Sequence, residues 1–292
     1  MSTVFAPVFE PGFFADEAVR EAILVGTLVA VVAGAVGFFT VMRSQSFAAE
    51  ALGDLGTAGG SGAFLLGAGA LSGFLAVDVL AALVMQLLGV ERPRGRDLAT
   101  GLVLGAGLGL AALLLYLGTT ETSTTGATVT VLFGSIFSIA HDTLPLIAAL
   151  SFAVLALVAV LYRPLLLASV SGEIAAARGI RTSVVGGAYL VALALAVALA
   201  ALTIGAILST ALIVGPAASA LRLTRRPARA IVLAGAIGVG AMWLGILLAY
   251  DSFYWPPQER GWPVSFFVVA AIFVVYLLSG MAGVRGRCSR GS

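Results

Sequence analysis

Nine long apolar runs recur along this chain, and they limit the folds that it can adopt. Each run reaches or approaches the roughly 20 residues with which an α-helix crosses a bilayer. Mean hydropathy is +1.10, and only 10% of the residues are charged. The sequence therefore predicts an all-α membrane protein, a polytopic bundle of about nine transmembrane helices. We expect these helices at residues 22–42, 46–66, 70–89, 98–117, 144–162, 184–202, 204–221, 230–250 and 264–281.

The placement of arginine predicts the orientation of the bundle in a cell (plasma or inner) membrane. Short loops rich in arginine stay in the cytoplasm. All sixteen basic residues are arginines, and only Arg20 and Arg260 fall on the side opposite to the rest. We therefore expect a multi-pass protein with an external N-terminal segment at 1–21, one transmembrane domain at 22–281 and a cytoplasmic tail at 282–292.

The composition excludes several functions. No GxxxxGK[ST] motif is present, so the chain does not hydrolyse ATP by that route. The net charge of +2 reflects sidedness in the membrane, so we expect membrane lipid and no nucleic acid as a partner. A single cysteine, Cys288, gives neither a disulfide framework nor a zinc cluster. We expect no catalytic residue and no permanently bound cofactor.

Acidic residues inside the predicted helices are candidates for a transport site. Glu50 and Asp54 lie four residues apart, on one face of the second predicted helix. A carboxylate within a bilayer costs roughly 2.5–3.5 kcal/mol on insertion scales, so the pair needs a cation, water or a proton. Alternatively, Glu50 reaches back to cytoplasmic water. Asp78, in the third predicted helix, either faces the same pathway or hydrogen-bonds a neighbouring helix.

The segment 118–143 is first polar and then apolar. Its apolar part has about twelve residues, too few to span a bilayer, so we expect a short external or re-entrant helix. His141, the only histidine, follows this part. It could be a metal ligand or a pH-sensitive gate, or else a solvated loop histidine or helix cap.

The cytoplasmic loop 163–183 predicts a short helix. Ser171 and Glu173 offer capping groups near its start, the helix-prone stretch reaches Arg178, and Gly179 offers a stop. Isolated helices below about 12 residues are marginal in water. We therefore expect this helix either to dock on a partner protein or to lie on the membrane surface.

Gly215 and Pro216 interrupt the seventh predicted helix. Proline removes a backbone donor and kinks a helix, which exposes carbonyl groups. Either these carbonyl groups line a pathway, or the proline is only an irregularity in helix packing.

Taken in order, these segments resemble the permease subunits of ABC importers for zinc, manganese and iron(II). The likeness covers about residues 22 to 280. It rests on VMRSQSF before an acidic second helix, on LFGSI after a long outer loop, on RPLLLASVSGEIAAARGI and on ILSTALIVGPAASA.

The resemblance implies a homodimer that moves a divalent metal ion (Mn, Zn or Fe(II)) as substrate, along a pathway between subunits lined by Glu50 and Asp54. It also implies cytoplasmic ATP-binding subunits docked on the loop 171–180, and an extracellular or periplasmic metal-binding protein. Many members carry aspartate and then histidine where this chain has Glu50 and Asp54. Two carboxylates are harder ligands than an aspartate and a histidine, which favours manganese or iron(II) over zinc. His141 could restore a nitrogen ligand.

Other functions stay open at this point. Glu50, Asp54 and Asp78 could form the proton or sodium relay of a secondary transporter, although the sequence shows no convincing internal repeat. An ABC permease for a metal chelate or vitamin would need a wider pathway and no acidic pair. A non-transporting scaffold or sensor is a third class.

Overall fold

The computed structural model describes residues 13–89, 96–121, 125–253 and 261–288. Every regular element in these residues is helical, which confirms the predicted all-α class. The helices are α1 Glu17–Met42, α2 Ser46–Leu65, α3 Ala70–Leu87, α4 Arg96–Glu121, α5 Thr125–Phe133, η1 Ile136–Ser138, η2 His141–Thr143, α6 Leu144–Val170, α7 Gly172–Ala177, α8 Thr182–Ile204, α9 Ala206–Leu223, α10 Pro227–Ser252 and α11 Val264–Cys288.

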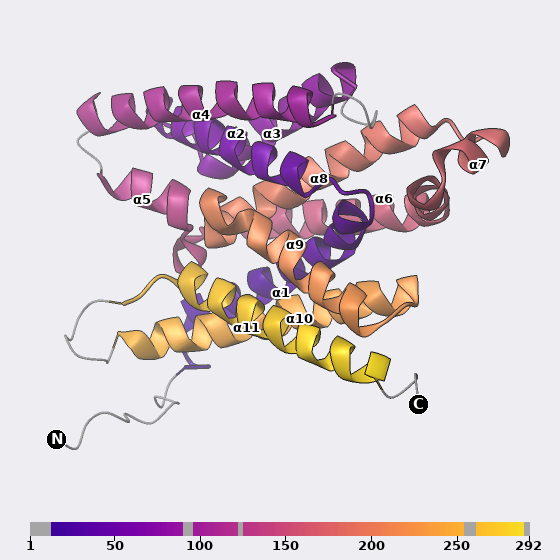
Figure 1. Ribbon diagram of the computed structural model, residues 1–292. Coiled ribbons are helices and arrows are strands. Elements are labelled where there is room, and N and C mark those ends of the chain that lie inside the picture. The colour runs from indigo at the N-terminus through magenta and orange to yellow at the C-terminus, as the bar shows by residue number, and fades with distance from the viewer. Residues whose placement is uncertain (1–12, 90–95, 122–124, 254–260, 289–292) are drawn as a thin grey trace.

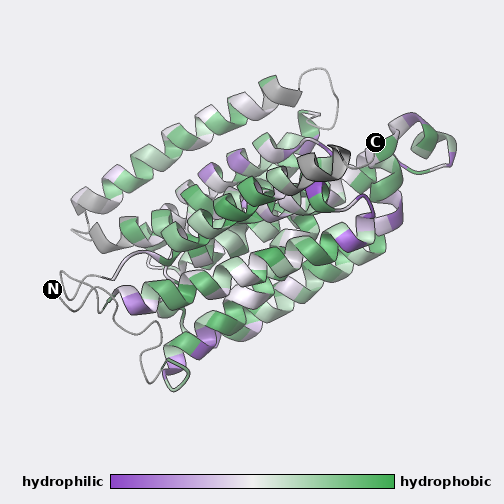
Figure 2. Cartoon of the chain, turned by 60° about the horizontal axis from the view of Figure 1, so that its bottom comes forward, coloured by the Kyte–Doolittle hydropathy of each residue, from purple (hydrophilic) through white to green (hydrophobic). Residues whose placement is uncertain are grey.

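Eight of the described helices are long and apolar enough to cross a membrane: α1, α3, α4, α6, α8, α9, α10 and α11. The second predicted span forms the 20-residue helix α2, but two carboxylates and five glycines lower its hydropathy. Hydrophobic residues cover the lengths of the helices, and hydrophilic residues gather mostly toward their ends (Figure 2). The structure thus agrees with a polytopic bundle of about nine spans.

α5 and α7 lie at opposite ends of the bundle, which we call the α5 end and the α7 end (Figure 1). α1 and α8 are the central helices, because 72% of the apolar stretch of each is buried. α4 runs along one edge of the bundle, and only 11% of its apolar stretch is buried. The hydrophobic core is therefore centred on α1 and α8.

α1 begins at Glu17, five residues before the predicted start, because Asp16 caps it. The Asp16 carboxylate accepts a hydrogen bond from the backbone N–H of Ala18 at 3.0 Å. Further along, α1 packs closely against α9 and α10. A side chain at Gly37 would overlap the carbonyl oxygen of Ile213 in α9, so this contact requires glycine.

Two predicted boundaries were wrong at the α7 end. α6 continues through Pro164 to Val170, so the loop predicted to begin at 163 begins at Ser171. An internal proline removes one backbone hydrogen bond, and the leucines and alanine after it favour helix. α11 continues to Cys288, past the predicted end at 281.

The segment between α4 and α6 contains α5 and the turns η1 and η2. α5 has nine residues and cannot cross a bilayer, as the sequence predicts. Gly134 (φ 77°), the residue after α5, meets Gly205 (φ 90°), which joins α8 to α9. A Cβ atom on Gly134 would lie 2.5 Å from the backbone nitrogen of Gly205. The two glycines therefore hold α5 against the turn between α8 and α9.

Candidate functional site

Four polar residues form a line along one face of α2, which we call the α2 polar stripe: Glu50, Asp54, Thr57 and Ser61. Their spacings of four, three and four residues place them on the same side of a helix. At 1.5 Å per residue, the stripe is about 16 Å long and runs from near the α7 end toward the α5 end.

The two carboxylates of the stripe are more exposed than its two hydroxyl groups. Glu50 and Asp54 are half-buried, whereas Thr57 and Ser61 are buried. Carboxylates one turn apart repel each other. The hydroxyl of Ser61 has no hydrogen-bond partner among the described residues. The stripe therefore offers oxygen ligands along one face of α2, with two carboxylates that a cation would compensate.

The other faces of α2 are occupied by neighbouring helices. Gly53 faces α9, where a Cβ atom on it would lie 3.0 Å from Ser209 Oγ. Gly60 faces α3, where a Cβ atom would lie 2.9 Å from the ring of Phe74. These glycines let α2 pack closely through faces other than the stripe.

Asp78 lies in the interface between α2 and α3. It is fully buried, and a Cβ atom on Gly56 would lie 2.7 Å from Asp78 Oδ1. Neither carboxylate oxygen has a hydrogen-bond partner among the described residues. A buried polar group without a partner is costly and calls for an explanation. Asp78 thus faces the glycine side of α2, and the α2 polar stripe lies on another face.

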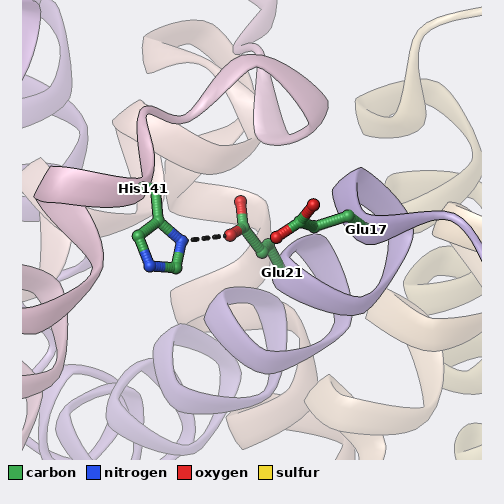
Figure 3. Close-up of side chains that lie close together, drawn as sticks. All are labelled: Glu17, Glu21 and His141. Atoms are coloured by element: carbon green, nitrogen blue, oxygen red, sulfur yellow. Dashed lines mark hydrogen bonds and ion pairs between the residues drawn. The ribbon is translucent and has the colours of Figure 1, made fainter.

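His141 does not join Glu50 and Asp54. It lies at the α5 end, where its Nδ1 is 2.5 Å from Glu21 Oε1 and Glu17 lies beside them (Figure 3). Glu50, in contrast, lies about one turn into α2 from the α7 end. The structure therefore separates two groups of candidate ligands, one near each end of the bundle.

The short helix predicted after α6 is present as α7. The Ser171 hydroxyl accepts a hydrogen bond from the backbone N–H of Ile174 at 3.3 Å and caps the start. Gly179 follows the helix with φ 77°. Glu173, Ile174 and Arg178 are exposed. α7, which lies at one end of the bundle (Figure 1), thus exposes both charged and apolar side chains.

Pro216 is buried within α9, which is one continuous helix. The preceding Gly215 packs against Ile272 of α11, and the following Ala217 faces Gly37 of α1. This position favours the packing interpretation of the proline.

Two sets of candidate residues were missed in the sequence. Thr57 and Ser61 continue the series from Glu50 at seven and eleven residues, a spacing visible in the sequence. The meeting of Glu17 and Glu21 with His141, about 120 residues away, depends on tertiary structure. No local pattern could have indicated it.

A polytopic bundle of membrane-length helices, with carboxylates inside α2 and α3, is typical of a membrane transport protein. The chain matches the ABC 3 transport family over residues 15–281, and it belongs to that family. It is therefore a multi-pass permease subunit of an ABC transporter.

Two relatives are similar over most of their length. The manganese import system permease protein ScaB of Streptococcus parasanguinis is 27% identical, over 86% of this chain and 87% of the relative. The manganese transport system membrane protein MntC of Listeria monocytogenes is 24% identical, over 83% of this chain and 85% of the relative.

Two solved structures share the fold. PsaBC from Streptococcus pneumoniae, in complex with Fab, superposes with a TM-score of 0.77 at 24% identity and covers 92% of each chain. A protein described as a metal-chelate type ABC transporter, in an inward-facing conformation, gives a TM-score of 0.66 at 19% identity, over 94% of this chain and 92% of the other.

Proposed function

We propose that this chain is the permease subunit of an ATP-driven importer of Mn²⁺, and that the α2 polar stripe lines the ion pathway. The observation that carries the proposal is the pair of half-buried carboxylates, Glu50 and Asp54, on a helix within the membrane domain. Intramembrane carboxylates of this kind mark ion pathways. Both relatives are named as manganese transport proteins, which supports manganese as the cargo.

The chemistry of the stripe agrees with this cargo. Carboxylate and hydroxyl oxygens are hard ligands that suit Mn²⁺. In a homodimer with two-fold symmetry, the same surface of each subunit faces the axis. Two copies of Glu50 and Asp54 would then place up to four carboxylates around one ion. Asp78 faces Gly56 on another face of α2, so it is not among these ligands.

The ATP-binding subunits dock on α7 in this proposal. Exposed Glu173, Ile174 and Arg178 form the contact, and ATP hydrolysis in the partner moves the permease between outward-open and inward-open states. The α5 end faces the outside, where an external metal-binding protein delivers the ion. The permease itself makes and breaks no covalent bond.

Mass spectrometry of total cellular metals tests the proposal. Cells with the complete transporter are compared with cells whose permease carries Glu50→Gln and Asp54→Asn. We expect manganese accumulation to fall to the level of cells without the permease. Ser72→Ala is the control, because it changes one exposed polar side chain outside the stripe, and we expect it to leave uptake unchanged.

Each other outcome points to a different function. If zinc or iron accumulation is lost and manganese accumulation is not, the cargo is zinc or iron. Unchanged levels of every metal, with the complex intact, would exclude the stripe from the mechanism and favour a chelate importer or a secondary transporter.

A further inference from the structure

A histidine and two glutamates from distant parts of the sequence meet at the α5 end of the bundle (Figure 3). Glu17 and Glu21 lie one turn apart at the start of α1, and His141 begins η2. Their ligand atoms all lie within 4.8 Å of one another. The cap by Asp16 fixes where α1 starts and therefore how both carboxylates are placed.

An ion pair and a bound cation are the two possible accounts of this cluster. The 2.5 Å contact between His141 Nδ1 and Glu21 Oε1 already pairs the imidazole with one carboxylate. Glu17 brings a second carboxylate to a place where like charges repel. The positive end of the α1 dipole favours acidic residues in the first turn, and a protonated imidazole would be attracted to both of them. A divalent cation would compensate both carboxylates at once.

The geometry and the ligand types suit a transition-metal ion. An ion bound at about 2.0–2.2 Å from each ligand spans donors up to about 4.4 Å apart. Glu17 and His141 are exposed, so small rotations of their side chains would bring the three donors within that span. Carboxylate oxygens suit manganese, and imidazole adds affinity for iron(II) and zinc.

A cavity of about 290 Å³ lies beside the loop that carries His141. Ala140 and Thr143, on either side of His141 and Asp142, contribute to its lining, as do Ser138 and Phe64. Phe64 belongs to the end of α2 that follows the α2 polar stripe. The loop that carries His141 therefore borders the same cavity as α2, the helix that carries Glu50 and Asp54.

We propose that Glu17, Glu21 and His141 form an entry site for a divalent transition-metal ion, separate from the α2 polar stripe. In the orientation proposed above, this site takes up the ion outside the cell before the ion reaches α2. Its role as an entry site rests on the proposed function, whereas its metal binding is measured without transport.

Pulsed EPR of bound Mn²⁺ tests the site in the full-length permease, purified without a histidine tag and placed in lipid nanodiscs. His141 is the only histidine in the chain, so a coupling of Mn²⁺ to an imidazole nitrogen identifies it. We expect this coupling in the wild-type protein and in Glu50→Gln/Asp54→Asn, and its loss in His141→Gln.

Further variants separate a metal site from an ion pair. Glu17→Gln leaves the contact between His141 and Glu21 in place, and we expect it to weaken Mn²⁺ binding at this site about tenfold, because the site loses one charged ligand. Glu173→Gln removes an exposed carboxylate in α7, at the opposite end of the bundle, and serves as the matched control with unchanged affinity in the purified permease.

Two results would overturn the proposal. One is the absence of nitrogen coupling in wild-type protein at saturating Mn²⁺. The other is coupling with unchanged affinity in Glu17→Gln, which would reduce the site to a contact with a lone histidine. If the nitrogen coupling is present but the stripe variant takes up every metal normally, the proposed function fails, and Glu17, Glu21 and His141 stand as a metal-binding site without the role of an entry site.

Discussion

At the scale of single residues, Gly59 sets how closely α2 and α3 approach. A side chain at this position would overlap the backbone carbonyl of Gly73, which cannot move aside as a flexible side chain would. We expect Gly59→Ala to destabilise the protein by about 1–3 kcal/mol through overpacking. Thermal unfolding of the purified permease in detergent measures this loss.

Gly62→Ala is the control in the same helix. Its new Cβ atom would meet only Leu114 Cδ1, at an ordinary 3.5 Å. We expect it to unfold at or slightly above the wild-type temperature, because alanine favours helix over glycine. Equal unfolding temperatures for Gly59→Ala and Gly62→Ala would show that α2 and α3 are not closely packed at this point.

Residue types in the sequence indicated part of the candidate site. Glu50 and Asp54 stand out because charge is rare in a membrane helix, and their shared face follows from helical periodicity alone. The environment of Asp78 could not be predicted in this way, since it depends on which face of α3 meets Gly56. His141 was predicted as a candidate metal ligand, but the carboxylates beside it come from α1, at the other end of a long sequence separation.

At the scale of elements, α7 is a six-residue helix that depends on its two ends. Gly179 has φ 77°, which proline cannot adopt, since its ring holds φ near −65°. Glu173→Arg together with Gly179→Pro therefore disrupts the end of α7 and reverses one of its exposed charges. We expect the ATP-binding subunit to co-purify with this variant at much lower yield, while membrane insertion is unchanged.

Gly240→Ala in α10 is the control for that experiment, because it lies outside α7 and a Cβ atom at this position meets no atom within 4 Å. Full recovery of the ATP-binding subunit with the double variant would show that docking occurs elsewhere.

Local signals predicted α7 well, since a capping serine and a terminal glycine act within a few residues. They failed at Pro164, where the helix continues because the rest of α6 supports it.

At the scale of the whole molecule, the distribution of arginine predicts which end faces the cytoplasm. Arg20 is the only arginine at the α5 end among those whose side chains the structure describes. The α7 end carries the others: Arg43, Arg163, Arg178, Arg181, Arg222, Arg225, Arg226 and Arg229. Loops rich in arginine are retained in the cytoplasm during insertion. The α7 end should therefore face inward.

Single cysteines test this orientation in a Cys288→Ser background, which carries no other cysteine. Ser138→Cys at the α5 end and Ala177→Cys in α7 both replace exposed residues. We expect a membrane-impermeant maleimide to label Ser138→Cys on intact cells, and to label Ala177→Cys only after the membrane is permeabilised. The reverse pattern would place α7 outside the cell. An ATP-binding subunit in the cytoplasm could then not reach α7, and the entry site at Glu17, Glu21 and His141 would become an exit.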